Sequence, residues 1–223
     1  MKERILGRGL AITLALAFSL MILAAAIYLP ATSAWIMRPL MVHFAPPEVT
    51  GLPAEEYAPV VDMITGYLKG DEGPFQHEFM VNGAGYAVFN AKEQHHMADV
   101  QGLFGLCRWI MWGCAGAACL LGLILRRQMR WRAFRRTLIG VLAAVAVIAL
   151  LAAIDFNGLF VLFHKIAFTN DLWLLNPRTD MLIRLMPLDF FISYVAIIGG
   201  IWLAGMALMM GASVLLQRLL PKE

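Results

Sequence analysis

Four apolar segments, each long enough or nearly long enough to cross a lipid bilayer, constrain this chain more than any other feature. They run from about Leu10 to Leu29, Gly102 to Leu125, Thr137 to Ile154 and Leu188 to Leu216. A helix needs about 20 apolar residues to cross a hydrocarbon core roughly 30 Å thick. Only 15% of the residues are charged, against about 25% in soluble domains. The sequence therefore predicts an all-α membrane protein with four transmembrane helices.

The positions of lysine and arginine predict the orientation of these helices. Residues 126–136 carry six arginines and no acid, whereas residues 30–101 carry three basic residues against nine acids. Because cytoplasmic loops are enriched in Lys and Arg, both termini and the arginine-rich loop are expected in the cytoplasm. The remaining basic residues of this pattern are Lys2, Arg4, Arg8, Arg218 and Lys222. We read the first apolar run as an uncleaved anchor, since it is longer than the core of a signal peptide.

This topology divides the chain into five regions. Residues 1–29 form the cytoplasmic N-terminus and first helix, residues 102–155 the second and third helices, and residues 188–223 the fourth helix and cytoplasmic C-terminus. Residues 30–101 are expected to be a small extracytoplasmic α/β segment, with a short amphipathic helix from Ala54 to Leu68 and a hairpin around Asn82-Gly83-Ala84-Gly85. Residues 156–187 form a second extracytoplasmic, interfacial segment.

A polar stretch that starts at Glu93 stands immediately before the second span. If the stretch is helical, Glu93 and His96 share a stripe, and Asp99 lies three residues after His96 and four after His95. A carboxylate at this spacing can fix the tautomer of either imidazole and stabilise its charged form. The alternative is a hydrated helix start, in which the acids favour the N-terminal end of the helix dipole.

A second polar cluster precedes the fourth span. Phe156 to Phe168 has the pattern of an interfacial helix, and His164 is its only imidazole. Trp173 is typical of an aromatic membrane anchor, and Asn176-Pro177 is typical of a turn. The polar residues that follow the helix are Asn170, Asp171, Asn176, Arg178, Thr179 and Asp180.

Arg108 is unusual because it lies inside the second span. A central arginine costs at least about 2.5 kcal/mol on insertion scales. It can reach the outer interface by snorkelling, pair with Asp155 or Asp189, or contact a substrate carbonyl or oxyanion.

The two clusters together form a pair of motifs. The first reads Glu93-x-x-His96-Met97-x-Asp99-Val100 and precedes the second span. The second comprises Phe163-His164, Trp173, Asn176-Pro177, Asp180 and Pro187 and precedes the fourth span. This pair, with the four-span order, resembles the lipoprotein intramolecular transacylase family (Lit) of bacterial membrane proteins over nearly the whole chain. His95 is additional to the family pattern.

The resemblance implies an acyltransferase of the bacterial plasma membrane with its active site on the extracytoplasmic face. Its substrate is a lipoprotein whose N-terminal cysteine carries a diacylglyceryl thioether. The sn-2 acyl chain moves to the α-amino group of that cysteine, which gives the lyso form, and no acyl-CoA or other cofactor is needed.

The residues fit this chemistry because an imidazole with a pKa of about 6.5 can accept a proton from an amine at neutral pH. His96 is then expected to be the base, oriented by Asp99 or Glu93, and His164 its acid–base partner; the two roles can be exchanged. The expected substrate contacts are Arg108, Trp173, Asn176 and Asp180.

Two other functions compete with this interpretation. A metal-dependent membrane hydrolase would bind zinc through His95 or His96 together with Asp99 and His164, although the chain has no HExxH motif. A non-catalytic membrane protein would bind lipid or a partner and would tolerate replacement of both histidines. The small net charge of +3 indicates membrane orientation and not a nucleic-acid partner.

Overall fold

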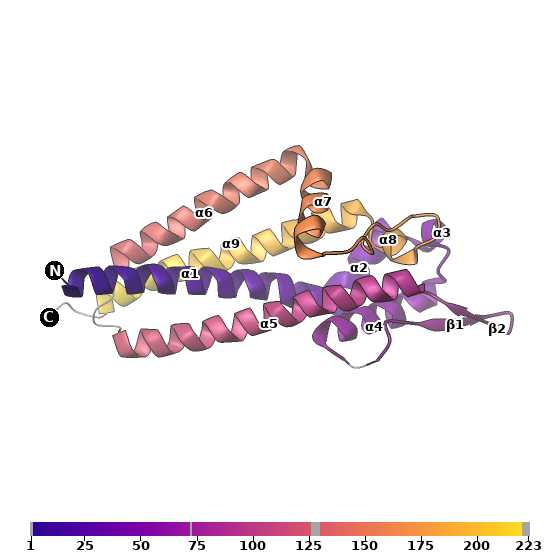
Figure 1. The fold of residues 1–223 in the computed structure, drawn as a ribbon, viewed down its shortest axis with the longest axis horizontal. Coiled ribbons are helices and arrows are strands. Elements are labelled where there is room, and N and C mark those ends of the chain that lie inside the picture. The colour runs from indigo at the N-terminus through magenta and orange to yellow at the C-terminus, as the bar shows by residue number, and fades with distance from the viewer. Residues whose placement is uncertain (1, 72, 126–129, 220–223) are drawn as a thin grey trace. The chain divides into compact units, whose positions relative to one another are not determined.

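The computed structural model describes residues 2–71, 73–125 and 130–219. Four of its helices are long and apolar enough to span a membrane, and Figure 1 labels them α1 (Lys2–Ala31), α5 (Ala91–Leu125), α6 (Trp131–Ile154) and α9 (Leu188–Leu219). These four helices, together with a two-stranded sheet that lies between α1 and α5 in the sequence, confirm the predicted fold class. Arg126, Arg127 and Lys222 of the predicted charge pattern lie outside the described residues.

The chain forms two compact units. The first comprises Met1–Ile27, Cys107–Ile154 and Ile198–Glu223, and the second comprises Tyr28–Leu106 and Asp155–Ile197. The four long helices therefore supply most of the first unit, whereas the second contains both polar clusters of the sequence.

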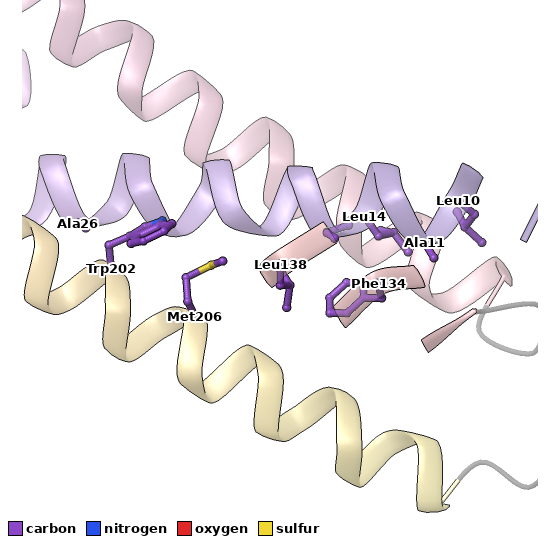
Figure 2. Close-up of a cluster of buried hydrophobic side chains, with 10 residues drawn as sticks. Leu10, Ala11, Leu14, Ala26, Phe134, Leu138, Trp202 and Met206 are labelled. Carbon is purple, nitrogen blue, oxygen red and sulfur yellow. The ribbon is translucent and has the colours of Figure 1, made fainter. Parts of the chain in front are cut away.

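The core of the first unit draws side chains from all four apolar helices, with Ala118 contributed by α5. Figure 2 shows Leu14 of α1, Phe134 and Leu138 of α6, and Trp202 and Met206 of α9 in one buried cluster. The outer face of α6 is exposed and aliphatic, with side chains such as Val147 and Leu150 more than half accessible. Such a face suits lipid, because helix packing in a bilayer does not require every apolar side chain to be covered by protein.

Four short helical elements open the second unit: α2 (Ala34–Phe44), α3 (Pro47–Thr50), the 3-10 turn η1 (Ala54–Glu56) and α4 (Tyr57–Lys69). The predicted helix over 54–68 is thus split into a turn and a longer helix. α4 packs against α2 and buries its apolar stripe, Tyr57, Val60, Val61, Ile64 and Leu68.

The predicted hairpin is confirmed and is tighter than its sequence pattern indicated. β1 (Glu78–Val81) pairs antiparallel with β2 (Ala84–Ala87) in the register Val81↔Ala84 (Figure 1). The two turn residues, Asn82 and Gly83, have φ values of 52° and 83°, as a two-residue hairpin turn with both central residues left-handed requires.

Two further helices complete the second unit. α7 (Phe156–Ala167) confirms the predicted helix over Phe156 to Phe168, while its position at the membrane interface stays a prediction. The Asp155 side chain caps it by accepting a 2.8 Å hydrogen bond from the Gly158 N–H. α8 (Met181–Leu185) is an additional one-turn element just before α9. It contacts α3, and Arg184 of α8 donates a 3.0 Å hydrogen bond to the carbonyl of Thr50.

Candidate active site

The first turn of α5 is fixed by a reciprocal capping pair. The Asn90 side chain accepts a 3.1 Å hydrogen bond from the Glu93 N–H, and the Glu93 carboxylate accepts a 2.7 Å bond from the Asn90 N–H. This arrangement satisfies two helix-terminal donors and defines where the helix begins. It thereby sets the helical register of the histidines that follow.

Glu93 also joins α5 to α8. Its side chain is 1% exposed, and its second oxygen accepts a 2.5 Å hydrogen bond from the Leu182 N–H. Both carboxylate oxygens therefore bind backbone N–H groups. Neither of these hydrogen bonds is made to His96, so the predicted role of Glu93 in orienting that imidazole is not carried by a direct bond. The carboxylate acts on the site by fixing the positions of α5 and α8.

The register of α5 separates the two adjacent histidines. His96 is 6% exposed, whereas the His95 ring lies on the exposed side, with Nδ1 2.6 Å from the carbonyl of Ala91 in its own helix. This geometry favours His96 over His95 as the functional residue.

His96 and His164 lie against each other although they are far apart in the sequence. Their ring centroids are 6.1 Å apart, and His164 is 8% exposed. Phe168 contacts both rings, with centroid distances of 5.2 Å to His96 and 5.6 Å to His164. The second unit thus brings the two predicted catalytic imidazoles into one buried cluster with apolar walls.

The protonation state of His164 follows from its surroundings. Nδ1 lies 2.7 Å from the carbonyl of Phe160, an acceptor, so Nδ1 carries a proton and donates it. In the neutral ring Nε2 is then the unprotonated nitrogen. Burial lowers the pKa of His164 below its ordinary value of 6.5, and the bond to Phe160 opposes this shift only in part. His164 is therefore neutral at pH 7 and offers Nε2 as a proton acceptor.

His96 differs from His164 in its hydrogen bonding. Its Nδ1 is buried and has no hydrogen-bond partner among the residues that the structure describes. A buried polar nitrogen without a partner is costly, and such groups cluster at functional sites. The ring is held by packing, and its Nδ1 is used by none of the described residues.

Asp99 reaches the loop that follows α7. Its carboxylate accepts a 2.9 Å hydrogen bond from the Asn170 side chain. Asn170 also accepts a 3.0 Å hydrogen bond from the Leu172 N–H, which shapes the loop immediately before Trp173. Asp99 therefore links the helix of His96 to the loop that covers His164.

Trp173 contacts the His164 ring directly. The ring centroids are 5.1 Å apart with an interplanar angle of 34°. The indole fixes the imidazole from one side while Phe160, at 4.2 Å, packs on it from α7. These contacts place Trp173 beside His164, while its predicted contact with the substrate stays a prediction.

Asp180 and Asn176 form the end of this loop. The buried carboxylate of Asp180 accepts hydrogen bonds from the Asn176 N–H at 2.7 Å, from the Thr179 hydroxyl at 2.8 Å and from the Asn90 side chain at 2.9 Å. The Asn176 side chain accepts from the Arg178 N–H at 3.0 Å. Both residues thus shape a turn and tie it to the start of α5, while their predicted substrate contacts stay predictions.

Asp180 gives the second unit a defined response to acid. Burial raises its pKa, but the hydrogen bonds outweigh burial and hold the pKa of Asp180 below the ordinary value of 3.8. The folded state therefore binds fewer protons than the unfolded state in this range. The stability that Asp180 contributes is present above about pH 4 and is lost as the pH drops through the folded pKa.

We expect Asp180→Asn to reduce the loss of thermal stability at acid pH in unfolding scans, whereas the exposed Asp62→Asn leaves that loss in place. An unchanged acid limb in Asp180→Asn would contradict the assignment.

Arg108 belongs to the first unit, whereas both histidines belong to the second. Its predicted contact with the substrate stays a prediction.

Three residues that shape the site, Asn90, Phe160 and Phe168, were not predicted from the sequence to belong to it. Of these, Asn90 had a recognisable signal, the capping pattern Asn-x-x-Glu.

The described residues contain no group of three or more His, Cys, Asp or Glu side chains that is suited to holding a metal ion. A zinc site needs three or four such ligands. The metal-dependent alternative therefore gains no support from the arrangement of these side chains.

Four apolar helices and a buried imidazole pair define the class of this protein, a polytopic membrane protein with a site suited to acid–base catalysis. The sequence model of the lipoprotein intramolecular transacylase family, Lit, matches residues 12–191. The chain belongs to this family and is an integral membrane acyltransferase.

Solved structures agree in fold. The membrane-integral lipoprotein intramolecular transacylase Lit from Bacillus cereus is 22% identical, with a TM-score of 0.78 over 96% of each chain. Two variants of that protein, with one histidine replaced by arginine or by alanine, are each 21% identical with TM-scores of 0.77. They cover 96% of this chain and 92% and 94% of their own, respectively. No curated protein matches the chain.

Proposed function

We propose that this protein moves the sn-2 acyl chain of a diacylglyceryl-modified lipoprotein to the α-amino group of the N-terminal cysteine of the same molecule. The observation that carries the proposal is the buried His96–His164 pair in a chain of the transacylase family. An ester and an amine that share one molecule need acid–base catalysis and correct positioning, and the pair offers the first of these without a serine or cysteine nucleophile.

His164 is assigned as the general base. Its Nε2 is the free acceptor because Nδ1 is bonded to the Phe160 carbonyl. The α-amino group has a free pKa near 8, so the ammonium first releases one proton to solvent and the amine releases a second during attack on the ester. His164 Nε2 accepts this second proton as the new N–C bond forms, which gives His164 the base role that the sequence suggested for His96.

His164 also returns the proton to the leaving group, and His96 assists as a hydrogen-bond donor. As the C–O bond to the glyceryl oxygen breaks, the proton held on His164 passes to that oxygen, and the departing group becomes an alcohol. His96 faces the same cluster with an unpartnered buried nitrogen, and it donates a hydrogen bond to the oxygen that carries the developing negative charge. A donor of this kind contributes roughly 3 kcal/mol to stabilising the transition state.

Burial of the pair favours transfer over hydrolysis. Exposures of 6% and 8% leave little room for water beside the rings. The acyl group therefore meets the amine of its own molecule, and the site gains the rate advantage of an intramolecular reaction once the flexible glyceryl linker is folded into attack geometry.

We place both termini in the cytoplasm and the histidine pair on the extracytoplasmic face of a bacterial plasma membrane. The arginine-rich stretch that ends with Arg135 and Arg136, and the nine acids within residues 30–101, support this orientation. Lipoprotein substrates carry their lipidated cysteine at that face.

The test uses purified protein in lipid nanodiscs with a synthetic peptide whose N-terminal cysteine carries a diacylglyceryl thioether. Tandem mass spectrometry follows the product, and we expect an N-acyl, S-monoacylglyceryl peptide of unchanged total mass. Release of a free fatty acid without N-acyl product would show that the protein is a hydrolase and not a transferase. An unchanged substrate would reject both activities.

A further inference from the structure

A cavity of about 420 Å³ lies beside the end of α7 that carries His164. Its walls come from α7, through Val161 and Lys165, and from the following loop, through Asn170, Asp171 and Trp173, among others. This volume is in the range of small-molecule sites. Because Trp173 contacts the His164 ring, the cavity adjoins the proposed base through a shared wall.

Two charged side chains line this cavity. Asp171 and Lys165 are both exposed, and neither charged group has a hydrogen bond or ion pair among the described residues. Asn170, also in the wall, is held by Asp99 at 2.9 Å. Half of the lining residues are polar, which suits a charged head group better than an acyl chain.

We propose that this cavity binds the N-terminal ammonium group of the lipoprotein substrate, with Asp171 as counter-ion and the Trp173 indole as an aromatic surface for the cation. This inference rests on the proposed function, because it names the part of that substrate which the cavity receives. The thioether and both esters of the substrate are neutral, so the ammonium is the only formal charge near the reacting bonds. A carboxylate and an indole face together recognise such a cation.

Lys165, on the α7 wall, affects which side of the cavity a bound cation prefers. Its ammonium repels a bound cation from α7 and favours the loop wall of Asp171 and Trp173. The indole that contacts the cation also contacts His164. The Trp173 indole therefore separates the cavity from the His164 ring and contacts both.

Binding can be measured apart from catalysis with two unreactive probes. Both are peptides with an N-terminal cysteine that carries a dialkylglyceryl thioether, with ether links in place of the esters; one has a free amine and the other an acetylated amine. Each carries a fluorophore at its C-terminus, and affinity for the full-length protein in nanodiscs is measured by anisotropy. An ion pair at a partly exposed site and one cation–π contact together predict about tenfold tighter binding of the free amine.

Charge variants give opposite predictions. Asp171→Asn should remove most of the preference for the free amine, Asp171→Glu should retain it, and Lys165→Gln should increase it. Asp62→Asn, an exposed acid of α4, is the matched control and should leave the preference unchanged.

Equal affinity of the wild type for both probes would overturn the proposal, as would an unchanged preference in Asp171→Asn. A change in the same direction for Asp171→Asn and Lys165→Gln would also reject it, because charge would then not be the cause. Selective binding of the free amine without conversion of the ester substrate would instead reject the proposed reaction and leave the ammonium site standing.

Discussion

His164→Gln is expected to reduce the rate of lyso-lipoprotein formation about 10²–10⁴-fold, the usual contribution of a general base. Gln is close in size to His and can still donate a hydrogen bond to the Phe160 carbonyl, but it offers no basic nitrogen. The measurement is the initial rate of N-acyl peptide formation by mass spectrometry, with purified variants at equal concentration.

His95→Gln is the matched control for that experiment. His95 neighbours His96 in the sequence, but its ring is exposed and contacts its own helix. We expect its rate to stay within about twofold of the wild type, as for exposed substitutions away from a site. Full activity in His164→Gln, or an equal loss in His95→Gln, would remove the basis for assigning His164 as the base.

Glu93→Ala is expected to lower the free energy of unfolding by about 2–6 kcal/mol. The buried N–H of Leu182 and the part-buried N–H of Asn90 lose their acceptor, and each such loss costs about 1–3 kcal/mol. The start of α5 and the start of α8 then separate, so activity should fall together with stability. Denaturant titration in micelles, followed by circular dichroism, measures the change.

Glu93→Gln distinguishes hydrogen bonding from the mere presence of a side chain. One amide oxygen can keep one of the two bonds, but the amide NH₂ meets a backbone donor, so the expected loss is intermediate. Glu55→Ala removes an exposed acid from η1 and should change stability by less than about 0.5 kcal/mol. A Glu93→Ala protein as stable as Glu55→Ala would show that the capping bonds contribute little.

The apolar spans and the hairpin could be predicted from the sequence because each follows from a local pattern. Span length, and an Asn-Gly turn between short alternating runs, are set by neighbours in the chain. The preference for His96 over His95 came from the resemblance to the transacylase family, because helical spacing alone gave either imidazole a carboxylate neighbour. In the structure His96 is buried on the same helix as the buried Glu93.

The remaining features depend on tertiary packing, which no local pattern reports. Nothing near His164 indicates that Phe168 contacts both it and His96, and nothing near Asp99 indicates Asn170 as its partner. α8 has five residues, too few for a helical period to be visible. Glu93 was interpreted as support for an imidazole because acids near histidines often have that role, although its spacing from Asn90 was also that of a helix cap.

Transfer within a single substrate molecule is tested most directly by a double-label crossover experiment. One lipopeptide carries a deuterated sn-2 acyl chain, the other carries a heavy-isotope peptide, and both are converted together by the wild-type protein. The account predicts N-acyl products of the two parental mass combinations only, with His164→Gln forming neither at a comparable rate. Products in which a deuterated chain is attached to the heavy peptide would show transfer between molecules and would contradict the account.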